Sequence, residues 1–288
     1  MGGDNSAFSA PVNRACLMGF LFRLLSHLPL YVLHNLGALA GWLAYVLSPT
    51  YRRHLRENMA LAGVADHRHA AIAEAGKTIL ELPKIWLRPQ AEVVGRVVKV
   101  DGWEHVDAAL AAGRGLVFMT PHLGCFEICA QYLAMHRPIT VLYRRSKQAW
   151  LAPIMEEGRG AHLNLAPADM SGVRRLLKAL KAGEMVGMLP DQAPGAGEGV
   201  WASFFGRPAY TMTLAARLAQ TGATVLFTYA ERLQYGAGYH LHFLPPEGAV
   251  DNPADINREI ERLVMLCPGQ YLWGYNRYKQ PSGAPEPT

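Results

Sequence analysis

The chain has 288 residues, half of them hydrophobic, with a formal net charge of +5 and a pI near 9.0. That length and apolar content suffice to bury a core and exclude disorder as the main state. The positive charge favours anionic partners such as membrane lipid, an acidic carrier protein or a phosphorylated substrate, whereas scattered basic residues and the lack of a recognisable module argue against nucleic acid.

The first 50 residues raise the question of a membrane. The chain is strongly apolar from Ala15 to Leu47, and Leu28 to Leu47 reaches about the minimum length of a span. A basic cluster, Tyr51 to Arg56, follows directly, as is typical of the cytoplasmic side and of contact with anionic lipid. We expect residues 1–50 to anchor the chain, as a span or an in-plane helix; the alternative is a buried hairpin of core helices with a solvated basic end.

Alternating helix and strand patterns follow. Helical spacing runs from Arg56 to Leu87 and stops at Pro89. Strands are predicted at Val93–Val100, Leu116–Thr120, Ile139–Tyr143, Met185–Leu189, Thr224–Glu231 and Tyr239–Phe243, and helices near His105–Ala112, Cys125–Met135, Trp150–Gly160, Gly172–Ala182, Thr211–Thr221 and Ala254–Cys267. This alternation predicts an α/β domain over residues 51–280, with a mixed, largely parallel sheet and helices on both faces. The Pro-rich tail 281–288 is expected to be disordered.

The most informative motif follows the second predicted strand. Thr120 to Glu127 reads TPHLGCFE, so that His122 and Glu127 are five positions apart. In one continuous helix such residues point about 140° apart, and the pair can meet only if His122 lies in the turn before the helix. Pro121 and Gly124 allow that turn. A His oriented by a carboxylate suits general-base catalysis; the plain alternative is a surface His beside a helix-capping Glu.

A second polar position also follows a predicted strand. Asp191 and Gln192 come directly after Met185–Leu189, and the glycine-rich stretch 193–199 comes next. Sites in such sheets gather at the C-terminal ends of strands, so Asp191 joins His122 as a candidate, with the stretch as a loop free to move over a substrate. The alternative for Asp191 is a turn-forming residue that bonds its own backbone.

The four cysteines show no metal or disulfide pattern. Cys16, Cys125, Cys129 and Cys267 lack paired spacing, which predicts reduced thiols and no structural zinc. A Cys125 nucleophile activated by His122 is chemically possible. Small buried apolar residues behind the site are the simpler interpretation.

Seven segments, taken in order, resemble one family. They are His122–Glu127, Tyr143–Arg144, Gly158–Arg159, Lys178–Glu184, Pro190–Gln192, Phe204–Gly206 and Trp273–Lys279. From about Leu28 to Lys279 the chain resembles the bacterial late acyltransferases of lipid A biosynthesis, within the lysophospholipid acyltransferase group. The resemblance implies transfer of an acyl chain from acyl carrier protein to a hydroxyl of a lipid A precursor, at the cytoplasmic face of the bacterial inner membrane, without metal or redox cofactor.

The resemblance also assigns roles to residues. His122 would be the general base and Glu127 its orienter, while Arg159 and Asp191 match residues that the family requires. Arg159 would neutralise the oxyanion or grip a phosphate, although a cation also suits the end of a helix. Arg144, Gln192, Asn276 and Arg277 are candidate substrate contacts; Arg144 and Arg145 could equally be surface charges. Ala193 and Pro194 depart from the commoner Asp-Gln-Asp-Tyr-Gly form, which affects the expected acceptor contacts.

Two other functions stay open at this point. A glycerophospholipid or lysolipid acyltransferase would use the same His chemistry, although those relatives more often carry Asp at the position of Glu127. A membrane lipid-binding protein that has lost catalysis would keep the fold, and the intact His122, Glu127 and Arg159 argue against it.

Overall fold

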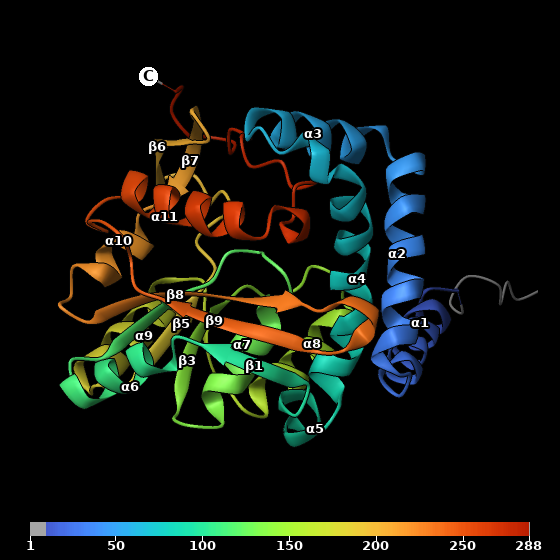
Figure 1. Cartoon of the computed structure of the whole chain (residues 1–288), viewed down its shortest axis with the longest axis horizontal. Helices are drawn as coiled ribbons and strands as arrows, with labels where there is room; N and C mark the ends of the chain where they lie inside the picture. The colour runs from blue at the N-terminus through green and yellow to red at the C-terminus, as the bar shows by residue number, and fades with distance from the viewer. Residues whose placement is uncertain (1–9, 288) are drawn as a thin grey trace, which may run out of the picture.

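The structure is a computed structural model that describes residues 10–287. Its centre is a seven-stranded sheet in the order β1-β9-β8-β2-β5-β3-β4 (Figure 1). The strands are β1 (Val97–Asp101), β2 (Leu116–Met119), β3 (Ile139–Tyr143), β4 (Asn164–Pro167), β5 (Met185–Met188), β8 (Thr224–Arg232) and β9 (Tyr239–Leu244). Every neighbouring pair is parallel except β8 and β9. The predicted mixed, largely parallel sheet is therefore confirmed.

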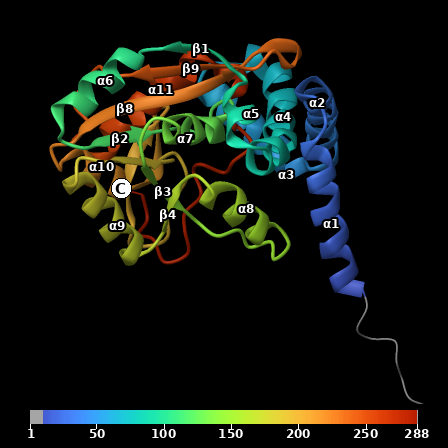
Figure 2. The same cartoon turned by 90° about the horizontal axis from the view of Figure 1, so that it is seen from below.

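Helices cover both faces of this sheet (Figures 1 and 2). The helices of the α/β region are α5 (Gln90–Val94), α6 (Trp103–Ala112), α7 (Phe126–Ala134), α8 (Leu151–Gly160), α9 (Met170–Lys181), α10 (Leu214–Ala219) and α11 (Pro253–Leu266). Alternate residues of β2 enter different cores: Val117 and Met119 pack with α9, α10 and α11, whereas Leu116 and Phe118 pack with α6 and α7. This period of two produces two hydrophobic layers from one strand.

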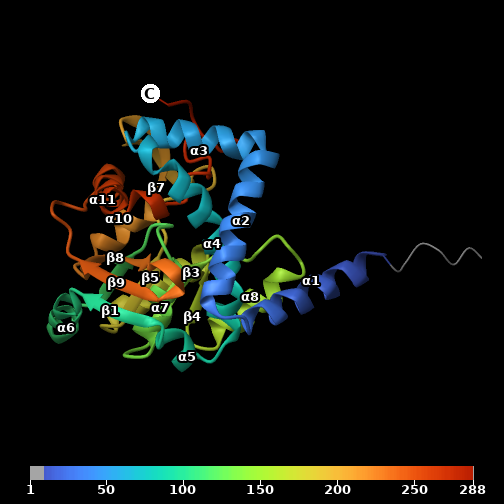
Figure 3. The ribbon, with the colours of Figure 1, turned by 45° about the vertical axis from the view of Figure 1, so that its right-hand side comes forward.

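The N-terminal helices form a layer at one end of the sheet. They are α1 (Ala10–Ser26), α2 (Leu30–Leu47), α3 (Pro49–Leu61) and α4 (Arg68–Leu87). Figure 3 shows α2 lying alongside α4 while α1 extends away from the body. The helical pattern predicted from Arg56 to Leu87 is thus broken between α3 and α4, where Gly63 adopts a φ of 71° that favours glycine.

Helix α2 is docked against α4 through glycines. A Cβ at Gly41 would lie 2.1 Å from the Ile72 carbonyl oxygen, and one at Gly76 would lie 1.9 Å from that of Gly37. Buried His34 of α2 also contacts the Glu81 carboxylate of α4 at 3.2 Å. One face of α2 therefore packs against α4. The opposite face carries several large apolar side chains that are exposed, namely Tyr31, Leu36, Leu39, Leu43, Val46 and Leu47.

The structure departs from the predicted elements in two places. Residues 93–100 were expected to form one strand, but α5 ends at Val94 and β1 begins only at Val97. The short strand β4 was not predicted, nor was the antiparallel hairpin β6 (Gly199–Phe204) and β7 (Arg207–Met212). In the described part of the tail, the Trp201 indole donates to the Pro285 carbonyl at 2.7 Å, and the disorder of 281–288 stays a prediction.

Candidate active site

The site lies where β2 and β5 end side by side. The two strands are parallel neighbours, so the residues that follow them meet at one edge of the sheet. His122 follows β2, and its carbonyl accepts from the Leu272 N–H at 3.1 Å. Gly124 has a φ of 61°, and a Cβ there would lie 1.9 Å from the Ala230 carbonyl oxygen. Only glycine fits this close approach, which fixes the turn carrying His122.

Asp191 is the carboxylate that contacts His122. Its Oδ1 lies 2.7 Å from Nδ1 of the imidazole, and its Oδ2 accepts from the His122 backbone N–H at 2.9 Å. A carboxylate only accepts, so the proton resides on Nδ1 and the Nε2 lone pair is left as the basic site. Gln192 then donates to Nε2 at 3.1 Å, which occupies the position that a substrate hydroxyl would take.

Electrostatics favour an ionised Asp191. Its side chain is 2 % exposed, and burial alone would raise the pKa of the carboxyl. The His122 charge and the hydrogen bonds that His122 donates outweigh burial, so that the pKa of Asp191 is lower than usual. An anion that is ready to stabilise a developing imidazolium is what general-base catalysis requires.

Glu127 is engaged elsewhere, which corrects the expectation that it orients His122. It is the second residue of α7, one turn beyond His122. Its carboxylate accepts from Arg159 in a two-pronged pair, with Nε to Oε2 at 2.9 Å and Nη2 to Oε1. The Trp86 indole donates to the same Oε2 at 3.0 Å. Sequence proximity suggested the wrong partner because the start of α7 turns Glu127 toward α8 and α4.

Arg159 is held rigidly in this arrangement. Burial alone would lower the pKa of its guanidinium, but the Glu127 carboxylate raises it above its usual range. The guanidinium also stands over the Trp86 ring, 5.3 Å from the centroid, a favourable cation–π geometry. Gly158 makes this possible, since a Cβ there would lie 2.4 Å from the Trp86 carbonyl oxygen. Trp86 was not predicted, and no signal in its own segment marks it.

An apolar cavity lies beside the Glu127–Arg159 pair. Glu127 and Arg159 line it, and the Phe126 ring, which also lines it, lies 4.7 Å from the His122 ring between centroids. The remaining lining is almost entirely apolar and includes Phe118, Ala130, Leu133, Leu163, Met188 and Leu189. Such a lining suits a hydrocarbon chain with a polar group at the Arg159 end.

The other predicted substrate contacts divide into exposed and buried residues. Arg144 and Asn276 are exposed, as is Arg145, which pairs with Glu156. Arg277 is only 2 % exposed; it donates to the Tyr210 carbonyl, to Thr211 and to Asn257. Arg277 therefore ties the C-terminal segment to β7 and α11, which corrects its assignment as a substrate contact.

The glycine-rich loop after Asp191 is tied to tyrosines. The Ala193 N–H donates to the Tyr275 hydroxyl at 3.0 Å, and the Gly197 and Gly199 N–H groups donate to the Tyr210 hydroxyl at 3.1 and 3.3 Å. The loop expected to move freely thus has defined partners in this conformation. Tyr275 lies in the Trp273–Lys279 motif, which explains how that distant segment shapes the site.

Comparison with known proteins identifies the family of the chain. The family model "Bacterial lipid A biosynthesis acyltransferase" matches residues 5–280. The chain is 27% identical to the lipid A biosynthesis lauroyltransferase of Escherichia coli over 278 residues, covering 91% of this chain and 90% of that protein. It is 27% identical to the palmitoleoyltransferase of the same organism, covering 88% and 86%. A phosphatidylinositol mannoside acyltransferase of Mycobacterium tuberculosis is 30% identical, covering 58% and 54%. The chain belongs to the bacterial lipid A biosynthesis acyltransferase family and is an acyltransferase.

Proposed function

We propose that the enzyme moves a fatty acyl chain from acyl carrier protein to a hydroxyl of a lipid A precursor, by direct attack. The observation that carries the mechanism is the 2.7 Å contact between Nδ1 of His122 and Asp191. His122 Nε2 removes the proton of the acceptor hydroxyl, whose oxygen attacks the thioester carbonyl. Asp191 fixes the tautomer and stabilises the imidazolium, a role we expected of Glu127. Collapse of the tetrahedral intermediate expels the thiolate, which takes up the proton.

Arg159 supplies the positive charge in this mechanism. The pair with Glu127 uses two of the five guanidinium N–H groups. The others are available to the thioester oxygen or to a substrate phosphate, and a group already held in place costs no reorganisation during reaction. Glu127 acts as a positioning residue that keeps Arg159 beside the cavity. The acyl chain would lie along the apolar lining.

The acceptor is supported by similarity to proteins named for lipid A biosynthesis. The relative named for phosphatidylinositol mannoside acylation shares more than half of the chain, so the same scaffold carries at least one other named acceptor. Two features support acyl carrier protein as the donor. The chain has a net positive charge, and cations such as Arg144 and Lys147 are exposed near the end of β3. Both suit the docking of an acidic carrier.

A two-by-two assay tests donor and acceptor. Purified full-length enzyme in detergent is offered acylated carrier protein or acyl coenzyme A, with a lipid A precursor or a lysophospholipid. We expect the carrier protein and the lipid A precursor to be preferred, with turnover lost in His122→Ala and kept in the control His105→Ala, at a partly exposed position. Transfer from carrier protein should slow as salt rises, because exposed charges are screened beyond about 8 Å at physiological salt. A preference for acyl coenzyme A and lysophospholipid would contradict the substrate assignment alone.

We further propose that the outer face of α2 holds the enzyme on the cytoplasmic face of the inner membrane. By length and composition α2 could cross a membrane, but its glycine face is docked on α4. The exposed side chains Leu39 and Leu43 and the exposed Arg53 and Arg56 of α3 then suit an in-plane helix with anionic headgroups beside it.

Sedimentation with membranes tests this attachment. Wild-type protein should pellet at both low and high salt, because apolar burial is not screened. The double variant Leu39→Lys/Leu43→Lys should shift to the soluble fraction, whereas Asn35→Lys, at an exposed polar position of the same helix, should still pellet. Soluble wild-type protein at low salt without detergent would contradict the proposal.

A further inference from the structure

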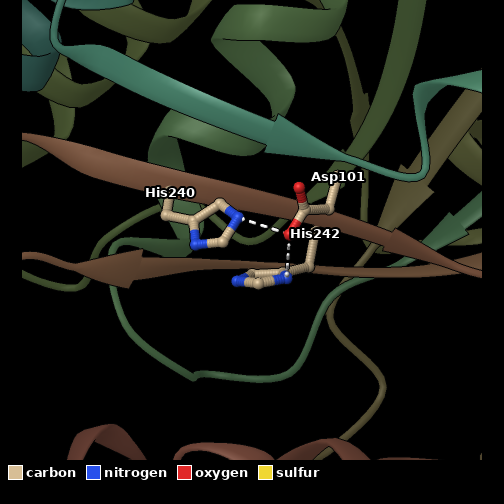
Figure 4. A group of neighbouring side chains, drawn as sticks. All are labelled: Asp101, His240 and His242. Carbon is tan, nitrogen blue, oxygen red and sulfur yellow. Dashed lines mark hydrogen bonds and ion pairs between the residues drawn. The ribbon is translucent and has the colours of Figure 1, made fainter.

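Two histidines and an aspartate converge on the sheet, on strands other than those that carry His122 and Asp191. His240 and His242 are alternate residues of β9, so both rings project from one face, while Tyr239, Leu241 and Phe243 point into the core. Asp101 is the last residue of β1 and is paired in register with His242. Figure 4 shows both imidazoles turned toward the Asp101 carboxylate.

The three side chains have the spacing of metal ligands. Oδ2 of Asp101 lies 2.7 Å from His240 Nε2 and 3.9 Å from His242 Nδ1, and one donor atom of each residue falls within 4.8 Å of the others. Ligands of a tetrahedral zinc ion, with bonds of about 2.0–2.2 Å, are separated by roughly 3.4 Å. The observed distances lie on both sides of that value, so small side-chain rotations would suffice.

A second carboxylate faces the opposite side of both rings. Glu231 Oε2 lies 3.8 Å from His240 Nδ1 and 3.8 Å from His242 Nε2, which are the two nitrogens not turned to Asp101. Metal-bound imidazoles usually donate their other N–H to a carboxylate. His242 Nε2 is buried and lacks a hydrogen-bond partner within residues 10–287, and Tyr229 stacks on its ring at 4.4 Å and 9°. The rings are thus oriented with a carboxylate on each side.

We propose that Asp101, His240 and His242 bind one divalent transition-metal ion of the zinc class, with a fourth position open to solvent. Imidazole nitrogen with one carboxylate oxygen suits Zn²⁺, Co²⁺ or Ni²⁺ rather than Mg²⁺ or Ca²⁺. Glu231, 3.8 Å from the second nitrogen of each ring, would accept from the rings once the ion is bound. The ion joins the edge strand β1 to β9 and takes no part in acyl transfer, so this site does not depend on the proposed function.

Lys99 provides an internal competitor for the ion. Its ammonium donates to the same Asp101 oxygen at 3.0 Å, and its side chain is 61% exposed. A cation would have to displace this ammonium, which can swing into solvent. Lys99→Met should therefore tighten metal binding, whereas a hydrogen-bonded cluster with no metal role would show no metal affinity to tighten.

Metal titration of untagged, full-length protein in detergent tests the site. Stripped protein should bind one equivalent of Zn²⁺ by calorimetry, and Co²⁺ should give the intense visible absorption of a four-coordinate site. Removing both ligands in His240→Ala/His242→Ala should weaken binding by more than about 100-fold, and Glu231→Gln by about 10-fold. The melting temperature of the wild type should rise with Zn²⁺ concentration, by roughly 5 °C when the concentration is 100 times the dissociation constant.

The matched control is His67→Ala/His69→Ala, another pair two residues apart but exposed near the start of α4. It should bind Zn²⁺ like wild type. The proposal is overturned if stripped wild-type protein binds less than about one tenth of an equivalent, or if the folded His240→Ala/His242→Ala variant binds as tightly as wild type. Circular dichroism of the metal-free variants establishes that they are folded.

Discussion

Two buried carboxylates stand at the same edge of the sheet, and their partners differ in kind. Asp191 contacts His122, a group whose charge changes during proton transfer. Glu127 contacts Arg159, a permanent cation, and receives a further hydrogen bond from Trp86. The first pair can therefore take part in proton movement, whereas the second can only hold a charge in place.

The difference also appears in the protonation of each pair. His122 keeps the pKa of Asp191 low despite burial, and Glu127 keeps the pKa of Arg159 high despite burial. Asp191 and Arg159 are therefore both charged in the resting enzyme, but only the pair of Asp191 with His122 gains charge complementarity as the reaction proceeds. We call His122 and Asp191 the reacting pair and Glu127 and Arg159 the fixed pair.

The strongest test of this division changes Asp191. In Asp191→Asn the amide can donate to Nδ1, which would favour the tautomer with the proton on the wrong nitrogen. We expect kcat to fall by about 100-fold to 10,000-fold, as for loss of a general base, with little change in KM. Steady-state kinetics with acylated carrier protein measure this, and the exposed Asp66→Asn is the control. Retention of more than about a tenth of the activity would show that Asp191 does not orient His122.

The second test breaks the fixed pair. Glu127→Gln leaves the Arg159 charge buried without its partner, which costs about 3–5 kcal/mol for a fully buried pair and somewhat less here because Arg159 is 18% exposed. We expect a lower melting temperature together with lower kcat. The exposed pair Arg53 and Glu57 provides the control, since Glu57→Gln should cost less than about 0.5 kcal/mol.

A double variant separates stability from function at the same place. Glu127→Leu/Arg159→Met removes both charges and should recover much of the stability lost in Glu127→Gln. Activity should stay low, because the proposed oxyanion or phosphate contact of Arg159 is gone. Recovery of activity in the double variant would show that the pair is purely structural.

The third test uses pH on the reacting pair. A carboxyl whose pKa is lowered by folding contributes stability above its unfolded pKa, near 3.9, and that contribution is lost as pH falls through the folded value. Asp191 has such a lowered pKa, so wild-type stability should drop below about pH 4. Asp191→Asn should show a shallower drop when melting temperature is followed from pH 7 to pH 3. Equal slopes would contradict an ionised Asp191 in the folded protein.

The rule that sites gather at the C-terminal ends of strands predicted more of this site than the spacing of His122 and Glu127 did. His122 and Asp191 were each expected at the end of a strand, and the structure places them in contact because β2 and β5 are neighbours. That adjacency depends on the strand order, which one sequence does not specify. Glu127 was chosen as the partner because it is close in the chain, although the start of α7 directs it to Arg159.

The elements that were missed have weak local signals. Strand β4 has four residues and ends in Pro167, and proline is disfavoured within strands. The hairpin β6–β7 turns at Phe205 and Gly206, both with positive φ, whereas the usual signal for such a turn is Asn-Gly or Asp-Gly. Trp86 was missed for a different reason: its role depends on Gly158, which brings α8 close to α4.

The smallest expected effect belongs to Cys125, which lies between the two pairs in sequence and belongs to neither. Its side chain is 2% exposed, and burial raises the pKa of its thiol well above the usual range. Because the thiolate is the nucleophilic form, Cys125 stays protonated and unreactive, so Cys125→Ala should keep most of its turnover, within about twofold, after a modest loss of packing. Single-turnover experiments with radiolabelled acyl donor, with His122→Ala for comparison, measure both turnover and any acylated enzyme. If folded Cys125→Ala is as inactive as His122→Ala, the acyl group passes through a thioester on the enzyme, and His122 activates a thiol before it activates the acceptor hydroxyl.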